Sequence, residues 1–131
     1  MTLELINPEG LPTPASYTQV IVATGSRLVF VAGQVADDAQ SNLVGPGDLA
    51  AQARQAFANV GRSLAAAGAG PEQVTKITIY VVHHRPEYLP EISDARMAVF
   101  GDHKPADTLV GVETLADPGY LIEVDAIAVV D

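Results

Sequence analysis

The sequence predicts a single α+β domain over residues 1–131, with a mixed β-sheet of about six strands backed by two helices. Three observations support this. The length suits one domain, two segments carry apolar residues at helical spacing, and the other apolar segments are short and rich in Val and Ile. The resulting order is β-β-α-β-α-β-β, with a further candidate strand at Leu3–Ile6.

The first half of the chain predicts a hairpin followed by a helix. Segments 19–24 and 27–35 are expected strands, and the intervening Gly25-Ser26 is typical of a two-residue hairpin turn. The apolar run at 28–32 suggests that both sheet faces are covered. Asp48 is suited to cap a helix that ends before Gly68, and the buried stripe of this helix is Leu49, Ala53, Ala56, Phe57, Val60, Leu64 and Ala67.

The second half predicts a strand, a helix and two more strands. Residues 74–82 alternate between apolar and polar side chains, as expected for a strand with one face on the core. Pro86 is suited to the first turn of a helix with the stripe Leu89, Ile92, Ala95, Val99 and Phe100. Strands are expected at 108–113 and 120–130. Two helices cover only one sheet face, so we expect association between subunits to cover the other.

Composition excludes several classes of protein. Without cysteine there is no disulfide, thiolate metal site or cysteine nucleophile. The formal charge is -9 and the seven Lys and Arg residues are scattered, which argues against a nucleic-acid partner. The N-terminal ten residues lack the regions of a signal peptide, and no apolar run reaches the length of a membrane span. We therefore expect a cytoplasmic protein with no membrane partner.

The three histidines do not predict a metal site. His83 and His84 are adjacent, so in a strand they point to opposite faces and cannot chelate one ion, and His103 has no partner at ligand spacing. Phosphate-binding glycine loops and G-x-S-x-G elbows are also absent.

Two carboxylates in the last strand form the first candidate site. Glu123 and Asp125 are two residues apart, so they share one face of the strand, between Ile and Val residues. Burying a carboxylate without a partner is costly. One interpretation is a cleft wall where a carboxylate moves protons. The other is a solvent-facing edge or an ion pair with Lys or Arg.

Five segments together resemble the Rid family, also called YjgF/YER057c/UK114. They are Pro14-x-x-Tyr17-x-Gln19 with Phe30-Val31-Ala32-Gly33-Gln34-Val35, Ala50-Ala51-Gln52-Ala53-Arg54-Gln55-Ala56-Phe57-x-Asn59-Val60, Lys76-Ile77-Thr78-Ile79-Tyr80-Val81, and Ile122-Glu123-Val124-Asp125-Ala126-Ile127-Ala128. The resemblance covers nearly the whole chain in order and spacing. It implies a chorismate-mutase-like fold, a homotrimer with clefts between subunits, and hydrolysis of imines and enamines to keto acids and ammonia without a metal or organic cofactor.

The resemblance also implies site residues. Glu123 matches the glutamate that is the family's usual candidate for holding the attacking water. Tyr17 matches the family's tyrosine near the N-terminus. Ala32, Gly33 and Gln34 match a stretch whose backbone lines the cleft, with alanine replacing the usual serine. The remaining expected substrate-binding positions are Ser93, where an asparagine is common, and Asp107, Thr108 and Leu109.

Asp107 is the main departure from the family pattern. Deaminating members have Pro-Ala-Arg where this chain has Pro105-Ala106-Asp107, and the resemblance implies that their arginine pairs with the substrate carboxylate. We therefore expect a 2-imino acid to bind poorly, and a neutral or cationic ligand to meet Asp107 instead. Arg96 lies one turn beyond Ser93. It either reaches the cleft as a substitute or pairs with Asp94, Asp102 or solvent.

Three functions stay open on the sequence alone. The first is a trimeric hydrolase that acts on a small-molecule imine, enamine or related C–N bond. The second is a non-catalytic binding or regulatory trimer that has lost the chemistry. The third is a specialised pathway hydrolase with its own substrate. The charge of -9 argues against a ribonuclease, an activity described for some family members.

Overall fold

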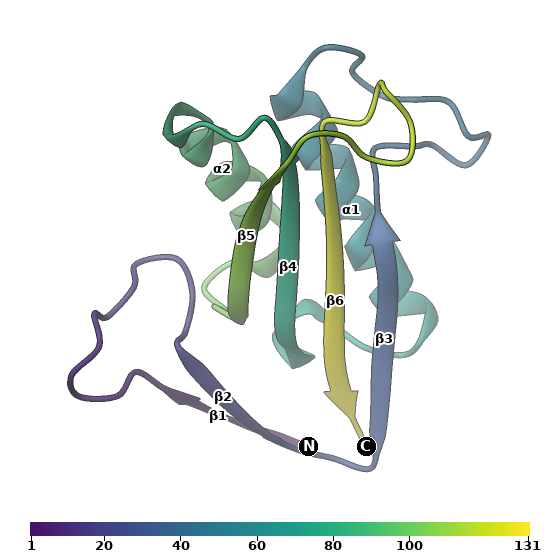
Figure 1. The fold of residues 1–131 in the computed structure, drawn as a ribbon. Helices are drawn as coiled ribbons and strands as arrows, with labels where there is room; N and C mark the ends of the chain where they lie inside the picture. Colours follow the sequence, from purple (N-terminus) through teal and green to yellow (C-terminus); the bar gives the residue numbers. More distant parts are fainter.

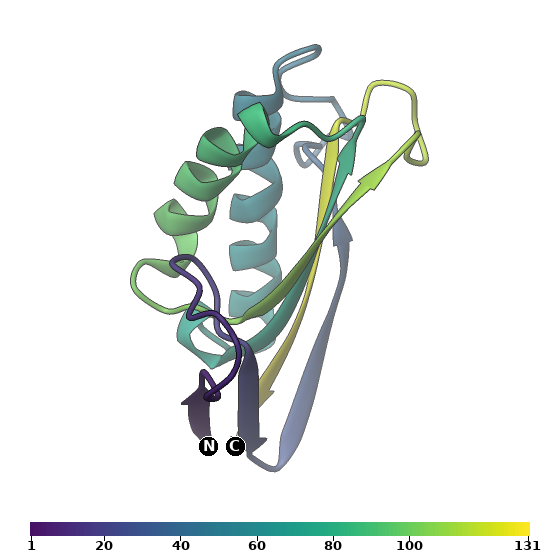
Figure 2. The same cartoon turned by 60° about the vertical axis from the view of Figure 1, so that its left-hand side comes forward.

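The computed structural model describes residues 1–131 and places two helices against one face of a four-stranded sheet (Figures 1 and 2). The α+β prediction of two helices and six strands is confirmed. The elements are β1 (Thr2–Ile6), β2 (Val20–Thr24), β3 (Arg27–Gln34), α1 (Leu49–Ala66), β4 (Val74–Val82), α2 (Leu89–Phe100), β5 (Ala106–Val112) and β6 (Ile122–Val130). Short 3-10 turns at Pro71–Gln73 and Pro86–Tyr88 precede β4 and α2. No helix combines the length and apolar character needed to cross a membrane.

The four-stranded sheet has the order β3-β6-β4-β5. β6 is antiparallel to both neighbours, and β4 and β5 are parallel because α2 connects them. β3 and β5 are the edge strands. The last strand of the chain is thus central, which places the carboxylates of β6 in the middle of the sheet.

The hydrophobic core lies between the helices and one face of this sheet. Alternation places Ile77, Ile79 and Val81 of β4 on that face, and all three are fully buried. Phe57 of α1 packs edge-to-face on Phe100 of α2, with ring centroids 6.3 Å apart. The opposite face, called the open face below, carries no helix (Figure 2).

Most predicted boundaries agree with the structure. Asp48 caps α1 by accepting a hydrogen bond from the Ala51 N–H, and Gly68 leaves the helix with φ +73°. Pro86 opens a 3-10 turn, and α2 begins three residues later. β5 begins at Ala106, two residues earlier than expected, and β6 begins at Ile122, two residues later.

The prediction of a single sheet and of a hairpin at Gly25-Ser26 is wrong. β1 and β2 pair only with each other and form a separate ribbon, and β2 does not pair with β3 (Figure 1). Position 25 requires glycine for a reason other than a turn. A Cβ at position 25 would overlap Val129 Cγ1 and lie 3.0 Å from the Val130 carbonyl oxygen. Gly25 therefore allows the chain to pass close to the end of β6.

Gly25→Ala is expected to lower the free energy of unfolding by about 1–3 kcal/mol, because the added methyl has no space against β6. Urea unfolding followed by circular dichroism measures this. Gly61→Ala is the matched control: its Cβ would meet only Val99 Cγ1 at 3.6 Å, inside α1. We expect it to stabilise the protein by about 0.5–1 kcal/mol. Equal effects at the two sites would contradict the close-approach explanation.

Candidate functional site

The predicted site residues separate into two groups on opposite faces of the sheet. Residues paired across strands point to the same face. Asp107 and Leu109 pair with the buried Ile77 and Ile79, so they point toward the helices. Glu123 pairs with Tyr80 and points to the open face. The structure therefore does not bring Glu123 together with Asp107 within one chain.

The first group, called here the β3–β6 site, comprises Ala32, Gly33, Gln34 and Glu123. The pairing register of β3 on β6 shifts between Val31 and Gln34, which marks a β-bulge at Ala32-Gly33. A Cβ at Gly33 would overlap the Glu123 carboxylate. Glycine at this position thus lets the carboxylate lie directly over the bulged backbone. Gly33 and Gln34 also line a pocket of about 590 Å³ at the upper end of β3.

The two carboxylates of β6 have different surroundings. Asp125 accepts hydrogen bonds from the Thr78 backbone N–H (3.2 Å) and the Tyr80 hydroxyl (3.4 Å). The negative charge of Asp125 is the main cause that raises the pKa of Tyr80. Glu123 makes no hydrogen bond or ion pair and is half-buried. Glu123 is therefore the carboxylate available to a water or a ligand.

Two polar side chains of α1 hold the backbone around this site. Gln52 is fully buried, donates to the carbonyls of Gly45 and Gly119, and accepts from the Leu121 N–H two residues before Glu123. Asn59 donates to the carbonyl of Val35 at 2.9 Å, just after β3. The sequence does carry a signal for this role. Gln52 and Asn59 stand among the apolar positions of α1, and a buried amide side chain needs hydrogen-bond partners. The sequence alone does not assign them this role.

The second group lies between α2 and β5. A pocket of about 270 Å³, called here the α2–β5 pocket, is lined by Ser16, Leu89, Pro90, Ile92, Ser93, Arg96 and Leu109. Ser93 and Arg96 also line an adjacent pocket of about 240 Å³ with Ala15, His103 and Lys104. The predicted residues Ser93 and Leu109 are thus brought together.

Asp107 lies behind this pocket and pairs with Arg96. Nη2 of Arg96 is 2.6 Å from Oδ2 of Asp107, and the two side chains are only 9% and 8% exposed. Nη1 of Arg96 donates to the Ser16 carbonyl at 3.2 Å. Among the partners considered for Arg96, neither Asp94 nor Asp102 is the one observed.

The pair is close but not fully hydrogen-bonded. Despite the short distance, the Arg96 N–H is not directed at Oδ2 of Asp107, and Nε of Arg96 has no acceptor. Burial is the largest influence on Asp107 and raises its pKa, while Arg96 and Lys76 lower it. Desolvation thus outweighs the attraction, as is common for buried ion pairs.

Two predicted residues lie outside both groups. Tyr17 is half-buried and follows Ser16, but it does not line the α2–β5 pocket. Thr108 is exposed on the open face, where its hydroxyl accepts from Lys76 Nζ at 2.7 Å. No three His, Asp or Glu side chains are grouped in a way that would hold a metal ion.

Comparison with known proteins gives matches over almost the whole chain. The family described as Endoribonuclease L-PSP matches residues 9–130. The RutC family protein slr0709 of Synechocystis is 34% identical, with 98% of each chain covered. The 3-aminoacrylate deaminase RutC of Acinetobacter baylyi is 32% identical, again with 98% of each chain covered.

Solved structures show the same fold. A crystal structure of YyfB from Yersinia pestis, described as a protein of unknown function of the conserved Rid family, superposes with a TM-score of 0.92 at 37% identity and covers 98% of this chain and 99% of its own. The YjgF gene product of E. coli superposes with a TM-score of 0.68 at 28% identity, covering 96% of this chain and 98% of its own.

Proposed function

Since the chain belongs to the Rid family, described as Endoribonuclease L-PSP, we propose that it binds a small molecule between copies of itself and hydrolyses a C=N or related C–N bond. Relatives about 30% identical are named imine or enamine deaminases. The family description also names an endoribonuclease, but a charge of -9 without a basic strip does not favour an RNA substrate.

The observation that carries the proposal is the free carboxylate of Glu123 over the Gly33 backbone. Asp125, two residues away, is occupied by Thr78 and Tyr80. A carboxylate without protein partners at a bulge is placed to accept a proton from a water molecule. The bulged backbone adds groups that can hold the same ligand.

The chemistry balances with water as the only co-reactant. Water adds to the electrophilic carbon of the C=N bond, and Glu123 orients it and takes its proton. The proton passes to the nitrogen and gives a carbinolamine. The hydroxyl proton of the carbinolamine then moves to the nitrogen through Glu123, the C–N bond breaks, and a carbonyl compound and ammonia leave. No group with a redox or metal role enters these steps.

We propose that the two half-sites meet between neighbouring copies of a homotrimer. Within one chain the β3–β6 site and the α2–β5 pocket lie on opposite faces and near opposite sheet edges. A cleft that contains both therefore needs Glu123 from one copy and Ser93, Arg96 and Leu109 from the next. Thr108 and Tyr17 stay candidates for the rim of that cleft.

We propose a neutral ligand, because the charges of Arg96 and Asp107 cancel within the chain. Nε of Arg96 has no acceptor, but Nη2 lies against Asp107 and Nη1 donates to the Ser16 carbonyl, so the guanidinium has no two free donors side by side for a carboxylate. Asp107 for its part has a cation and is not available to a ligand's ammonium. The chain thus lacks the net positive site that a 2-imino acid requires.

The test compares two imines generated in situ, 2-iminopropionate and its carboxamide analogue, by ammonia release above the spontaneous rate. We expect acceleration for the neutral imine and at least about tenfold less for the carboxylate, the effect of roughly 1.4 kcal/mol of lost pairing. Asp107→Asn removes the anion that occupies the Arg96 guanidinium while keeping the size of the side chain. It is expected to reverse the preference, because the guanidinium is then free to pair with the substrate carboxylate. A wild-type preference for the carboxylate would overturn the neutral-ligand assignment.

The occupied Arg96 also favours a second candidate, a non-catalytic binding protein. That protein would bind the neutral imine's stable ketone product or carboxamide analogue without accelerating ammonia release from any imine. Calorimetric binding together with blank turnover would select this second function over the first.

A further inference from the structure

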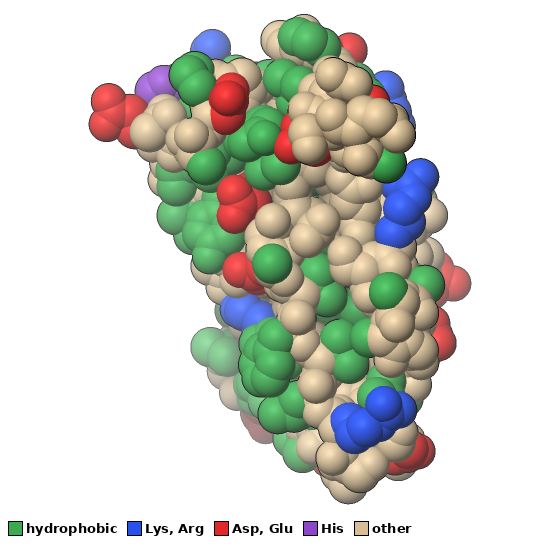
Figure 3. Space-filling view, turned by 90° about the vertical axis from the view of Figure 1, so that its right-hand side faces the viewer, with side chains coloured by type: hydrophobic (Ala, Val, Ile, Leu, Met, Phe, Trp, Pro, Cys, Tyr) green, Lys and Arg blue, Asp and Glu red, His purple; other side chains and the backbone are tan.

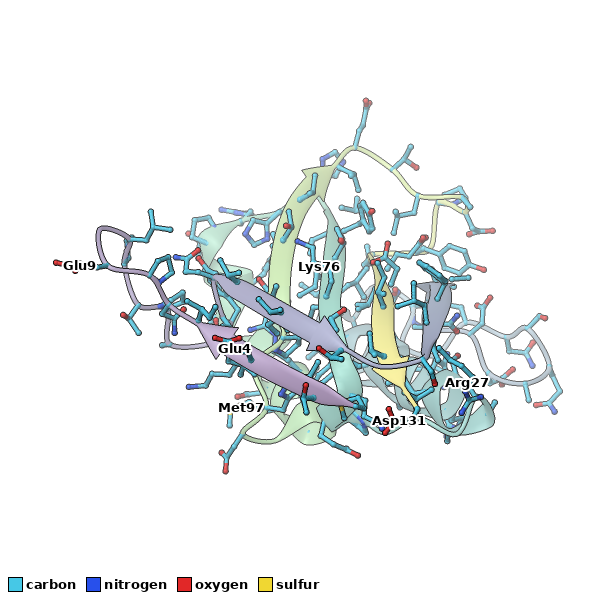
Figure 4. All side chains as sticks on the ribbon, turned by 90° about the horizontal axis from the view of Figure 1, so that it is seen from below. Glu4, Glu9, Arg27, Lys76, Met97 and Asp131 are labelled. Carbon is cyan, nitrogen blue, oxygen red and sulfur yellow. The ribbon has the colours of Figure 1, made fainter.

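The β1–β2 ribbon is the part of the fold with the fewest partners. Its strands hydrogen-bond to each other over five residue pairs and to no other strand. Viewed from below, the ribbon runs across the end of the sheet instead of continuing it (Figure 4). A two-stranded ribbon on its own is only marginally stable in water, so a further contact is expected.

Both faces of the ribbon carry apolar side chains. By alternation, Leu3, Leu5 and Ile21 share one face, and Ile6, Val20 and Val22 share the other. Leu5 is 47% exposed, Val20 41% and Val22 48%. Thr2, Glu4 and Thr24 make one end of the second face polar, whereas Ile6, Val20 and Val22 make its other end apolar. The pattern therefore indicates cover over the whole first face and over the apolar end of the second.

β3 has a matching unpaired edge. It bonds to β6 on one side only, which leaves its other side free along Arg27–Gln34. Leu28 is 62% exposed and Phe30 70% exposed on this strand. Figure 3, viewed from the β3 side, shows hydrophobic side chains with few charges among them over the lower half of the molecule. Free apolar edges of this kind invite another strand.

The ribbon cannot reach the β3 edge of its own chain as it is held here. At one end Gly25 lies against Val129, and the Ser26 N–H donates to the Val130 carbonyl. At the other end Thr18 bonds through its N–H to the Pro105 carbonyl, beside β5. These anchors fix β2 beneath β5 and β4, away from β3 (Figure 1).

The same ribbon position occurs in the YyfB crystal structure. If the 24 residues before Gly25 lay elsewhere in that structure, only 107 of the 131 residues could superpose. The TM-score could then not exceed about 0.82 (107/131), whereas the observed score is 0.92. The ribbon therefore superposes there too.

We infer that β2 of one copy pairs antiparallel with the free edge of β3 in the neighbouring copy, so that the ribbon is an exchanged arm. The register is the one that a two-residue hairpin would have had, with Ala23 opposite Leu28. This inference rests on the proposed assembly of copies around the cleft. It adds that Ser16, which lines the α2–β5 pocket and accepts a hydrogen bond from Arg96, stands in the segment that leads into the arm fastening the next copy.

The absence of cysteine permits a direct test by disulfide trapping. Ala23→Cys and Leu28→Cys replace exposed side chains, so both variants are expected to fold. The two single variants are purified separately, refolded together, oxidised, and separated on a non-reducing gel. We expect a cross-linked dimer that contains one chain of each variant. Ala23→Cys mixed with Ser41→Cys, a remote exposed loop position, is the control that should not cross-link.

Light scattering on the same samples separates this inference from the proposed assembly. A trimer with no mixed disulfide, or a double variant Ala23→Cys/Leu28→Cys that closes only within one chain, would refute the exchanged arm and leave the cleft intact. A monomer at all concentrations would refute both. A trimer with the mixed disulfide supports both.

Discussion

Replacing Arg96 with methionine is expected to lower the free energy of unfolding by about 3–5 kcal/mol at neutral pH, because Asp107 is left buried without its cation. Methionine keeps the length and apolar stem of the arginine, so the core contacts of α2 are largely retained. Urea unfolding monitored by circular dichroism measures the loss. No single substitution on the exposed surface of α2 is expected to lower the free energy of unfolding by as much.

The loss of stability in Arg96→Met is expected to become smaller as the pH falls. In the folded chain burial raises the pKa of Asp107, and without Arg96 only Lys76 remains to oppose that. A carboxyl group whose pKa is raised by folding stabilises the folded state while it is protonated. This stabilisation is lost as the pH rises through the raised pKa. The variant is therefore expected to approach the wild-type stability at mildly acid pH and to fall away from it at neutral pH.

Two further variants show whether the loss comes from the pair. Arg96→Met/Asp107→Leu removes both charges and is expected to restore stability to within about 1 kcal/mol of the wild type or above it. Arg85→Met breaks an exposed pair with Glu87 and is expected to change stability by no more than about 0.5 kcal/mol. A double variant as unstable as Arg96→Met would show that Asp107 is not the cause.

The sequence predicted the elements well because each has a local cause. Alternation along 74–82 and helical spacing after Asp48 depend only on neighbours in the chain, and β4 and α1 begin and end almost where these patterns do. Gly25-Ser26 misled the prediction because its local signal fits a hairpin turn. The actual reason for glycine is contact with Val129, more than 100 residues away.

The arrangement of the predicted site residues could be anticipated from the sequence only in part. Glu123 was placed on the correct strand face by period-two alternation, and Ser93 and Leu109 do share a pocket. The pairing of Arg96 with Asp107 has no local signal, because α2 and β5 are brought together only by the fold. The separation of the two groups onto opposite faces likewise depends on strand register, which the sequence alone does not give.

Glu123→Gln is expected to lower the rate of ammonia release from the neutral imine by about 10²–10⁴-fold, the usual contribution of a positioned acid–base group. Glutamine keeps the size and shape of the side chain, and the carboxylate has no ion pair to lose. Stability should therefore stay close to that of the wild type. Single-turnover kinetics and urea unfolding on the same preparation measure the two quantities.

Asp125→Asn is the matched control, because it alters the other carboxylate on the same strand face. Asp125 accepts from the Thr78 N–H and the Tyr80 hydroxyl, so its loss should affect the strand pairing more than the reaction. Its activity is expected to stay within about tenfold of the wild type, less than the effect of removing a proton-transfer group.

Gly33→Ala tests the geometry separately: the added methyl would displace the Glu123 carboxylate while leaving its charge unchanged. If Glu123→Gln and Gly33→Ala keep wild-type rates while Asp125→Asn loses activity, the proton acceptor is Asp125 and the free-carboxylate argument fails.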